Sequence, residues 1–346
     1  MKNEESIIIN DIRTSESFKK STFSKFKKTD VIRKCIYSIN ENKIEESLYW
    51  MFELLSSGHI LEIWNIIFEI MSKYIYYGNP KLPIYIEMRM NEFKKIIKHI
   101  QYDEIYLRNH NDIRFMFGEI IIILCISEKK NKLNLIKISS DDLFMEMKSM
   151  LVAPSLDYAN TYYTNFDPPE LLVPFNEFSY HIYKKNPSLQ KSIFWIEWIY
   201  VYEKTIKKKK LTLKCKKRNY VKLNSTNDNL YSDVIWIIWE AIFKEVKRRE
   251  NMYAKIIDSI YSLFILHYTA STKTKRKYMI YHVLYLLCES WTKDVNIIQS
   301  NRDIENENIK KITNKIFEQL KKNEVHVLEN TEMNIKEKKI EYINLI

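Results

Sequence analysis

The chain has 346 residues, of which 46% are hydrophobic, so it is long enough for two or three domains that each bury a core. Only three glycines occur, which excludes glycine-rich phosphate-binding loops and sheets with many tight turns. The net charge of +11 favours an acidic partner such as nucleic acid. However, lysine is enriched together with isoleucine, asparagine and tyrosine, so A/T-rich coding bias is a second explanation of that charge.

The first 29 residues carry lysines, serines and threonines around isolated phenylalanines, with no helical period. Chain ends of this composition are often poorly ordered, so residues 1–29 are predicted to form a flexible arm. Phe18, Phe23 and Phe26 offer an alternative, in which the arm is extended and docks through these rings.

Residues 30–150 are predicted to fold as an antiparallel stack of helices. Apolar residues recur at helical spacing over residues 32–39 and 44–55. Gly58 follows, where a residue in the left-handed conformation would end the second helix without a Cβ clash. A third apolar stripe ends at Pro80, which cannot continue a helix.

The stretch of residues 151–190 holds most of the prolines, together with tyrosines and asparagines. Its aromatic residues argue against a flexible linker, so it is predicted to be an ordered connector between two helical halves. A basic helical domain is expected over residues 191–328, and a charged tail over residues 329–346.

The predicted second domain contains two W-x-x-W patterns, each followed by a basic run. Trp195 and Trp198 would share one helix face, as would Trp236 and Trp239, and among isoleucines they are expected to be core residues rather than base-stacking platforms. Between the two pairs, residues 211–223 alternate like a strand and are the candidate for a small basic β-hairpin. The predicted fold class is all-α.

Three basic clusters fall in the second domain, and the first has no acidic residue across positions 204–222. Such clusters contact phosphates, so binding would depend strongly on salt and weakly on sequence. The alternative is a solvated surface whose lysines follow coding bias. The candidate nucleic-acid-binding residues are Lys207, Lys208, Lys209, Lys210, Lys214, Lys216, Lys217, Arg218, Lys247, Arg248, Arg249, Lys275, Arg276 and Lys277.

An ordered series of residues runs through positions 30–82, and it is carried by Asp30, Ser38, Tyr49, Trp50, Gly58, Ser72, Asn79 and Pro80. In order and spacing this series resembles the helical region that follows the ATPase module in MgsA/RarA-like proteins. These are the replication-associated AAA+ ATPases that include the Werner-helicase-interacting protein. An unrelated helical hairpin with ordinary caps would reproduce much of the same series.

The segment departs from the family at Asn79, where an aspartate is usual, and at Lys73-Tyr74, where an acidic pair commonly follows the serine. No glycine in the chain precedes a lysine followed by serine or threonine, so there is no Walker A loop. The resemblance therefore implies the collar and oligomerisation architecture of the family without its ATP hydrolysis.

The remaining patterns predict no catalytic, metal or cofactor site. His267, His282 and Cys288 lack the close spacing that brings ligands onto one ion. The acids at positions 141–142 and around Asp167 are expected to cap helices or face solvent. The four cysteines form no close pair, which favours a reduced intracellular compartment, and no signal peptide or membrane span is expected.

These features predict a non-enzymatic accessory protein of DNA replication or repair, in the cytoplasm or at the site of replication. Its first domain would self-associate or bind a clamp-loader-like protein, and its second would hold the backbone of DNA or RNA. The composition suits a large DNA virus or another A/T-rich genome. The alternative is a structural or scaffold protein, such as a virion or assembly component, whose helices pack only against other proteins.

Overall fold

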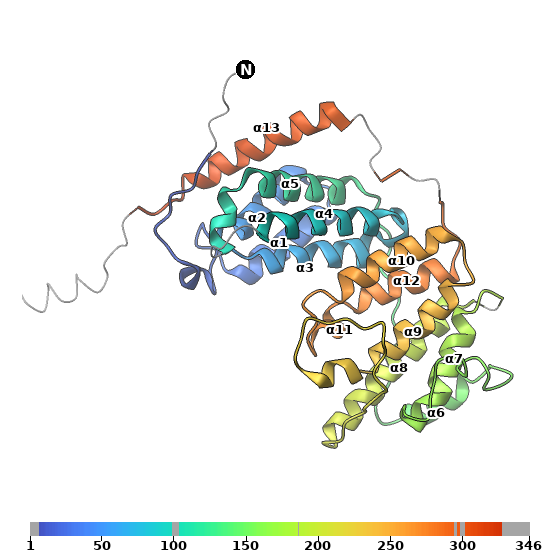
Figure 1. Ribbon diagram of the computed structural model, residues 1–346. Coiled ribbons are helices and arrows are strands. Elements are labelled where there is room, and N and C mark those ends of the chain that lie inside the picture. Colours follow the sequence, from blue (N-terminus) through green and yellow to red (C-terminus); the bar gives the residue numbers. More distant parts are fainter. Residues whose placement is uncertain (1–6, 99–103, 186, 294–295, 298–301, 327–346) are drawn as a thin grey trace, which may run out of the picture. The chain divides into compact units, whose positions relative to one another are not determined.

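The computed structural model describes residues 7–98, 104–185, 187–293, 296–297 and 302–326 (Figure 1). Within these ranges the chain is all-helical, as predicted, and the only β pairing is an isolated bridge between Ser21 and Lys27. None of the helices described is long and apolar enough to cross a membrane. The predicted tail at residues 329–346 lies outside the described residues.

The chain divides into two compact units whose boundaries differ from those predicted at residues 150 and 190. Unit 1 comprises Met1–Ile67, Lys95–Ile126 and Ser300–Ile346, and unit 2 comprises Phe68–Lys94 and Ser127–Gln299. The difference arises because helices distant in sequence pack together, which apolar spacing along the chain does not reveal.

Unit 1 is built from helices at both ends of the sequence. The last helix, α13, packs against α2 and α5, and Figure 1 shows it running alongside α5. The ring of Phe317 on α13 lies 6.0 Å from that of Phe52 on α2. The elements of this unit are η1 (Ser15–Phe18), α1 (Lys28–Asn40), α2 (Ile44–Ser56), most of α3 (Ile60–Glu69), the end of α4 (Leu82–Lys98), η4 (Glu104–Asn109), α5 (Asn111–Ile126) and α13 (Arg302–Lys321).

The first two helices form the predicted antiparallel hairpin, in which the Ser38 hydroxyl donates to the Glu46 carboxylate at 3.2 Å. Gly58 ends α2 with a φ of 75°. Its N–H donates to the Leu55 carbonyl at 3.0 Å, and the next N–H donates to the Leu54 carbonyl at 2.9 Å. This pair of bonds is a Schellman motif, so the predicted role of Gly58 is confirmed.

Residues 7–29 pack onto the rest of unit 1, which corrects the predicted flexible arm in favour of the docking alternative. Phe18 and Phe23 are buried, and the Phe23 N–H donates to the Ser57 hydroxyl at 2.8 Å. Phe26 stays 39% exposed, but its ring lies 5.4 Å from that of half-buried Trp50. Tyr49 is half-buried beside the same ring. The phenylalanines were sufficient to predict docking of this segment, because burial of an apolar ring is favourable.

The third predicted helix changes character where unit 2 begins. After α3 the chain makes a π-helical stretch, η2 (Ile70–Ile75), and a short turn, η3 (Tyr76–Gly78). A Cβ on Gly78 would lie 2.3 Å from the Glu128 carbonyl, so this position requires glycine. Ser72, Asn79 and Pro80 are buried in unit 2, so the residues of the family resemblance are shared between the two units.

The four tryptophans of the two W-x-x-W patterns lie in unit 2, and all of them are fully buried, as predicted. Its helices pack mainly as the pairs α7 with α8, α8 with α12, and α10 with α12. Besides η2, η3 and most of α4, its elements are α6 (Leu143–Ser149), η5 (Pro169–Leu171), α7 (Leu172–Ile182), α8 (Leu189–Lys208), η6 (Asp228–Ser232), α9 (Ile235–Val246), α10 (Asn251–Phe264), α11 (Thr272–Lys275) and α12 (Lys277–Cys288).

The predicted β-hairpin at residues 211–223 is wrong. Leu211 is 59% exposed, and the Cys215 N–H bonds to the carbonyl of Ser232 rather than to a facing strand. Arg218, which the hairpin would have exposed, is buried. The alternation of apolar and polar residues was too short to bury one face of a two-stranded ribbon, and long-range contacts determine the path instead.

Candidate nucleic-acid interface

The candidate basic residues differ greatly in exposure. Arg218 and Arg276 are buried, and Arg249 and Lys277 are half-buried. The exposed residues are Lys207, Lys208, Lys209, Lys210, Lys214, Lys216, Lys217, Lys247, Arg248 and Lys275.

Arg218 is a structural residue, which corrects its assignment to phosphate binding. Its guanidinium donates to Asp167 at 2.6 and 2.9 Å and to Glu240 at 2.8 Å. Burial by itself lowers the pKa of Arg218, but the bonds to these two carboxylates outweigh burial and raise it. Burial likewise raises the pKa of Asp167, yet Arg218 holds it below its ordinary value. The pair joins the connector to the segment before α9.

The third basic cluster, residues 273–277, also has buried members in unit 2. Arg276 donates to three backbone carbonyls at and just beyond the end of α10, so its assignment to phosphate binding is wrong. Lys273 is buried and pairs with Glu203 at 2.5 Å and with Asp233 at 2.8 Å. Lys277 forms an ion pair with Glu197 at 2.9 Å. Carboxylates and backbone carbonyls of unit 2 therefore bind these three cations.

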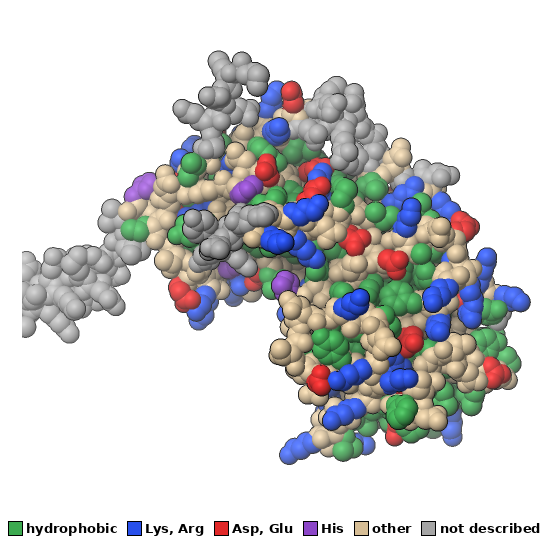
Figure 2. Space-filling view, in the orientation of Figure 1, with side chains coloured by type: hydrophobic (Ala, Val, Ile, Leu, Met, Phe, Trp, Pro, Cys, Tyr) green, Lys and Arg blue, Asp and Glu red, His purple; other side chains and the backbone are tan. Residues whose placement is uncertain are grey.

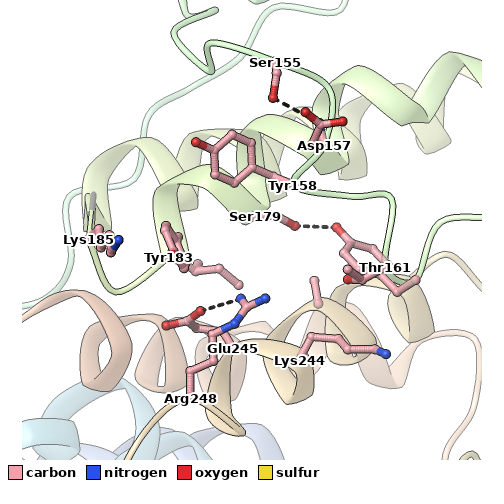
Figure 3. A pocket seen from close by; sticks show the side chains of 13 residues that line it. Ser155, Asp157, Tyr158, Thr161, Ser179, Tyr183, Lys185, Lys244, Glu245 and Arg248 are labelled. Carbon is pink, nitrogen blue, oxygen red and sulfur yellow. Dashed lines mark hydrogen bonds and ion pairs between the residues drawn. The ribbon is translucent and has the colours of Figure 1, made fainter.

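A cavity of about 510 Å³ opens between the connector, including α7, and α9 (Figure 3). Tyr158 and Tyr183 face it from the connector, and Lys244 and Arg248 from α9 and its C-terminal end. The Arg248 guanidinium bonds to the Glu245 carboxylate at 3.1 Å and lies 5.3 Å from the Tyr183 ring centroid. Aromatic rings and cations therefore line the same opening.

Two further cavities, of about 430 and 680 Å³, adjoin the first. Thr161 and Tyr162 line both the first and the second cavity, and Tyr220 and Glu240 line both the second and the third. Lys244 lines the first and the third. We call these three neighbouring cavities, all within unit 2, the basic groove.

Basic residues outnumber acidic ones in the basic groove by eight to four. The basic residues are Lys185, Lys216, Lys217, Arg218, Lys244, Lys247, Arg248 and Arg249, and the acidic ones are Asp157, Glu240, Glu245 and Asp258. Among the described residues, no acid forms an ion pair with Lys185, Lys216, Lys244 or Lys247. These four lysines are therefore the charges left to attract a phosphate.

The two arginines after α9 share one buried acid, whose single negative charge offsets only one of their two positive charges. Glu245 is 2% exposed, and it accepts hydrogen bonds from Arg249 at 2.9 Å and from the Lys184 backbone N–H at 3.0 Å, in addition to Arg248. Arg249 also donates to the Ile182 carbonyl at 3.2 Å. These bonds fix the floor of the basic groove, and they leave less of the arginine charge for a ligand.

The lysines at the end of α8 do not belong to the basic groove. Lys207 pairs with Glu203 at 2.8 Å, and the run through Lys210 lines none of the three cavities. On the face drawn in Figure 2, basic side chains are separated by hydrophobic and neutral ones rather than gathered in one block. The clusters around Lys216 and Lys247 come together, whereas the remaining basic residues are spread out.

Sequence reasoning missed the aromatic half of the basic groove. Tyr158 and Tyr183 in the connector and Tyr220 before α9 are half-buried at its edges. Lys185 was also missed, because it lies outside the long basic runs. The signal available was the tyrosine-rich composition of the connector, which indicated order but not which cavity its rings would line.

The other residues considered for chemistry have structural surroundings. His282 is fully buried, and burial lowers its pKa to about 3. Burial raises the pKa of the Cys288 thiol to about 12. Asp142 is exposed and precedes α6, but its side chain makes no capping bond. Asp167 is buried and paired with Arg218, so the prediction that it caps a helix or faces solvent is wrong. Within the described ranges, no three His, Cys, Asp or Glu residues are placed to hold a metal ion together.

No protein-family model, curated protein or solved structure matches the chain. The likeness of residues 30–82 to MgsA/RarA-like proteins stays a prediction. Any function assigned to the protein therefore depends on the residues of the basic groove and on the arrangement of unit 1.

Proposed function

We propose that the protein is a non-enzymatic nucleic-acid-binding accessory factor, whose basic groove holds the phosphate backbone of DNA or RNA. The observation that carries this proposal is a set of four lysines along three neighbouring cavities, none with an acidic partner among the described residues: Lys185, Lys216, Lys244 and Lys247. When lysines contact phosphates, counterions are released from the nucleic acid. This release gives affinity without sequence preference.

A role in DNA replication or repair is proposed from the family resemblance of residues 30–82. The hairpin of α1 and α2 would then be part of a surface through which unit 1 self-associates or binds a clamp-loader-like protein. Size-exclusion chromatography with light scattering, with and without DNA, tests this part. A mass equal to one chain under both conditions would contradict self-association.

The groove is tested by fluorescence anisotropy with a short labelled single strand and the matching duplex, at low and at moderate salt. The test variant replaces Lys185, Lys216, Lys244 and Lys247 with glutamine. We expect its affinity to fall at low salt. The slope of log affinity against log salt should become less steep by about 3 for the single strand, because each phosphate contact contributes about 0.7.

A matched control replaces with glutamine four exposed lysines of unit 1 that form no ion pair with any described acid: Lys20, Lys27, Lys311 and Lys322. Both variants lose the same net charge, so only the location of the lysines differs. Equal losses of affinity would show that general charge, rather than the basic groove, attracts nucleic acid. If the unmodified protein binds neither the single strand nor the duplex at low salt, the scaffold alternative is favoured.

A further inference from the structure

Phe166 is the most exposed large hydrophobic residue among those described, with 78% of its surface accessible. It lies in the connector, two residues after Thr164, which lines the second cavity of the basic groove. Exposing a phenylalanine ring to water is unfavourable, by about 1.5–3 kcal/mol relative to burying it. An exposed ring beside a basic groove is a candidate for contact with a ligand.

The turn that carries Phe166 is fixed rather than loose. The Asp167 N–H donates to the Thr164 carbonyl at 2.9 Å, and the Thr164 N–H and hydroxyl each donate to the Asp167 carboxylate at 3.0 Å. Asp167 is in turn held by buried Arg218. The backbone that carries the ring is therefore held in place, so little backbone entropy is lost when a ligand packs on the ring.

A cation lies beside the ring. The ammonium of Lys216 is 6.0 Å from the centroid of Phe166, and the Lys216 backbone N–H donates to Asp167 at 3.0 Å. Lys216 lines the second cavity and has no ion pair with any described acid. One short segment thus offers a flat apolar surface and a positive charge next to each other.

We infer that Phe166 stacks on an unpaired base of a single-stranded nucleic acid while Lys216 contacts a neighbouring phosphate; this inference rests on the proposed function. Stacking on an aromatic side chain requires a base whose face is uncovered, and the bases of a duplex cover one another. A ring on a protruding turn therefore selects single strands over duplexes, whereas the lysines of the basic groove attract both.

The test compares Phe166→Ala with the unmodified protein on three labelled ligands: short oligo(dT), an abasic strand of equal length, and a duplex. We expect roughly tenfold weaker binding of oligo(dT), because loss of one stacking contact weakens binding to that order. Affinities for the abasic strand and the duplex should not change. Phe166→Trp should retain the affinity for oligo(dT), since its ring also stacks.

Met145→Ala is the matched control, because Met145 is also exposed and apolar, at 74%, and lies on α6 outside the basic groove. It should change none of the three affinities. The inference is overturned if Phe166→Ala binds oligo(dT) normally, or if it loses equal affinity for the abasic strand or the duplex. In each case the four-lysine variant would still be impaired if the proposed function holds, so the two failures are distinguishable.

Discussion

The buried cations described in the two units differ in their partners: Arg108 and Arg114 of unit 1 bond only to uncharged oxygens, whereas in unit 2 Arg276 alone does so. In unit 1, Arg108 donates to the Ser56 carbonyl at 3.2 Å and Arg114 to the Ile7 carbonyl at 2.9 Å. Burial lowers the pKa of Arg114 to about 10. In unit 2, Arg218 and Lys273 pair with carboxylates, which outweigh burial and raise the pKa of each cation. Positive residues of this chain therefore serve partly as packing elements, and the total charge overstates the charge available to a ligand.

The largest expected effect comes from breaking a carboxylate pair of unit 2. Asp167→Ala leaves Arg218 buried without its main partner, and loss of one member of a buried pair costs about 3–5 kcal/mol of unfolding free energy. Urea unfolding followed by tryptophan fluorescence measures it, because four buried tryptophans lie in unit 2.

The control for this change is Asp228→Ala, which removes the exposed partner of Lys217. Exposed pairs contribute about 0–1 kcal/mol, so the unfolding free energy should hardly change. Similar small losses in both variants would show that the carboxylate of Asp167 does not stabilise unit 2 in the way described.

A smaller effect is expected from disturbing helix packing in unit 1. A Cβ at Gly118 on α5 would lie 2.8 Å from the Thr313 hydroxyl oxygen on α13. Gly118→Val should therefore lower the unfolding free energy by about 1–3 kcal/mol, the usual cost of overpacking. Combining it with Thr313→Ala should recover part of the loss. Chemical denaturation followed by far-UV circular dichroism tests both, and an unchanged midpoint for Gly118→Val would contradict close packing of the two helices.

The smallest expected effect is a pH dependence arising in unit 2. Burial holds the pKa of His282 at about 3 in the folded state, well below its ordinary value of 6.5. Between these values the unfolded chain binds a proton that the folded chain does not, so stability falls as the pH falls below 6.5.

One pH unit below the ordinary histidine pKa, this loss is about 1 kcal/mol. His282→Met should make the unfolding free energy less dependent on pH between neutrality and mild acid. Part of the dependence should persist, because burial also lowers the pKa of His181, to about 4. Identical pH profiles for the variant and the unmodified protein would exclude His282 as a source.

Local features of the fold were predictable, and long-range ones were not. Gly58 and the Trp195–Trp198 pair obey rules of capping and helical spacing that act within a few residues. The partner of Arg218 is Asp167, 51 positions away, and no pattern in the sequence pairs them. For the same reason a run of basic residues could not show which members face inward.

The candidate site was predictable to a similar extent. Lys216 and Lys247 were identified from charge alone, and the structure brings them to adjoining cavities. The predicted hairpin failed because a short alternation of residue types had no facing strand to pair with. Tyr158 and Tyr183 line the site only through tertiary folding of the connector, which composition could not resolve.

The packing of α13 against α2 and α5 has a consequence for biosynthesis. A ribosome completes α2 and α5 long before it makes α13, so the apolar surface around Phe52 stays uncovered on the nascent chain until translation of Phe317. Exposed apolar surface of this kind promotes aggregation and binds chaperones. Unit 2, whose segments precede α13, can finish folding first, and truncation just before α13 would yield a protein that depends on chaperones to stay in solution.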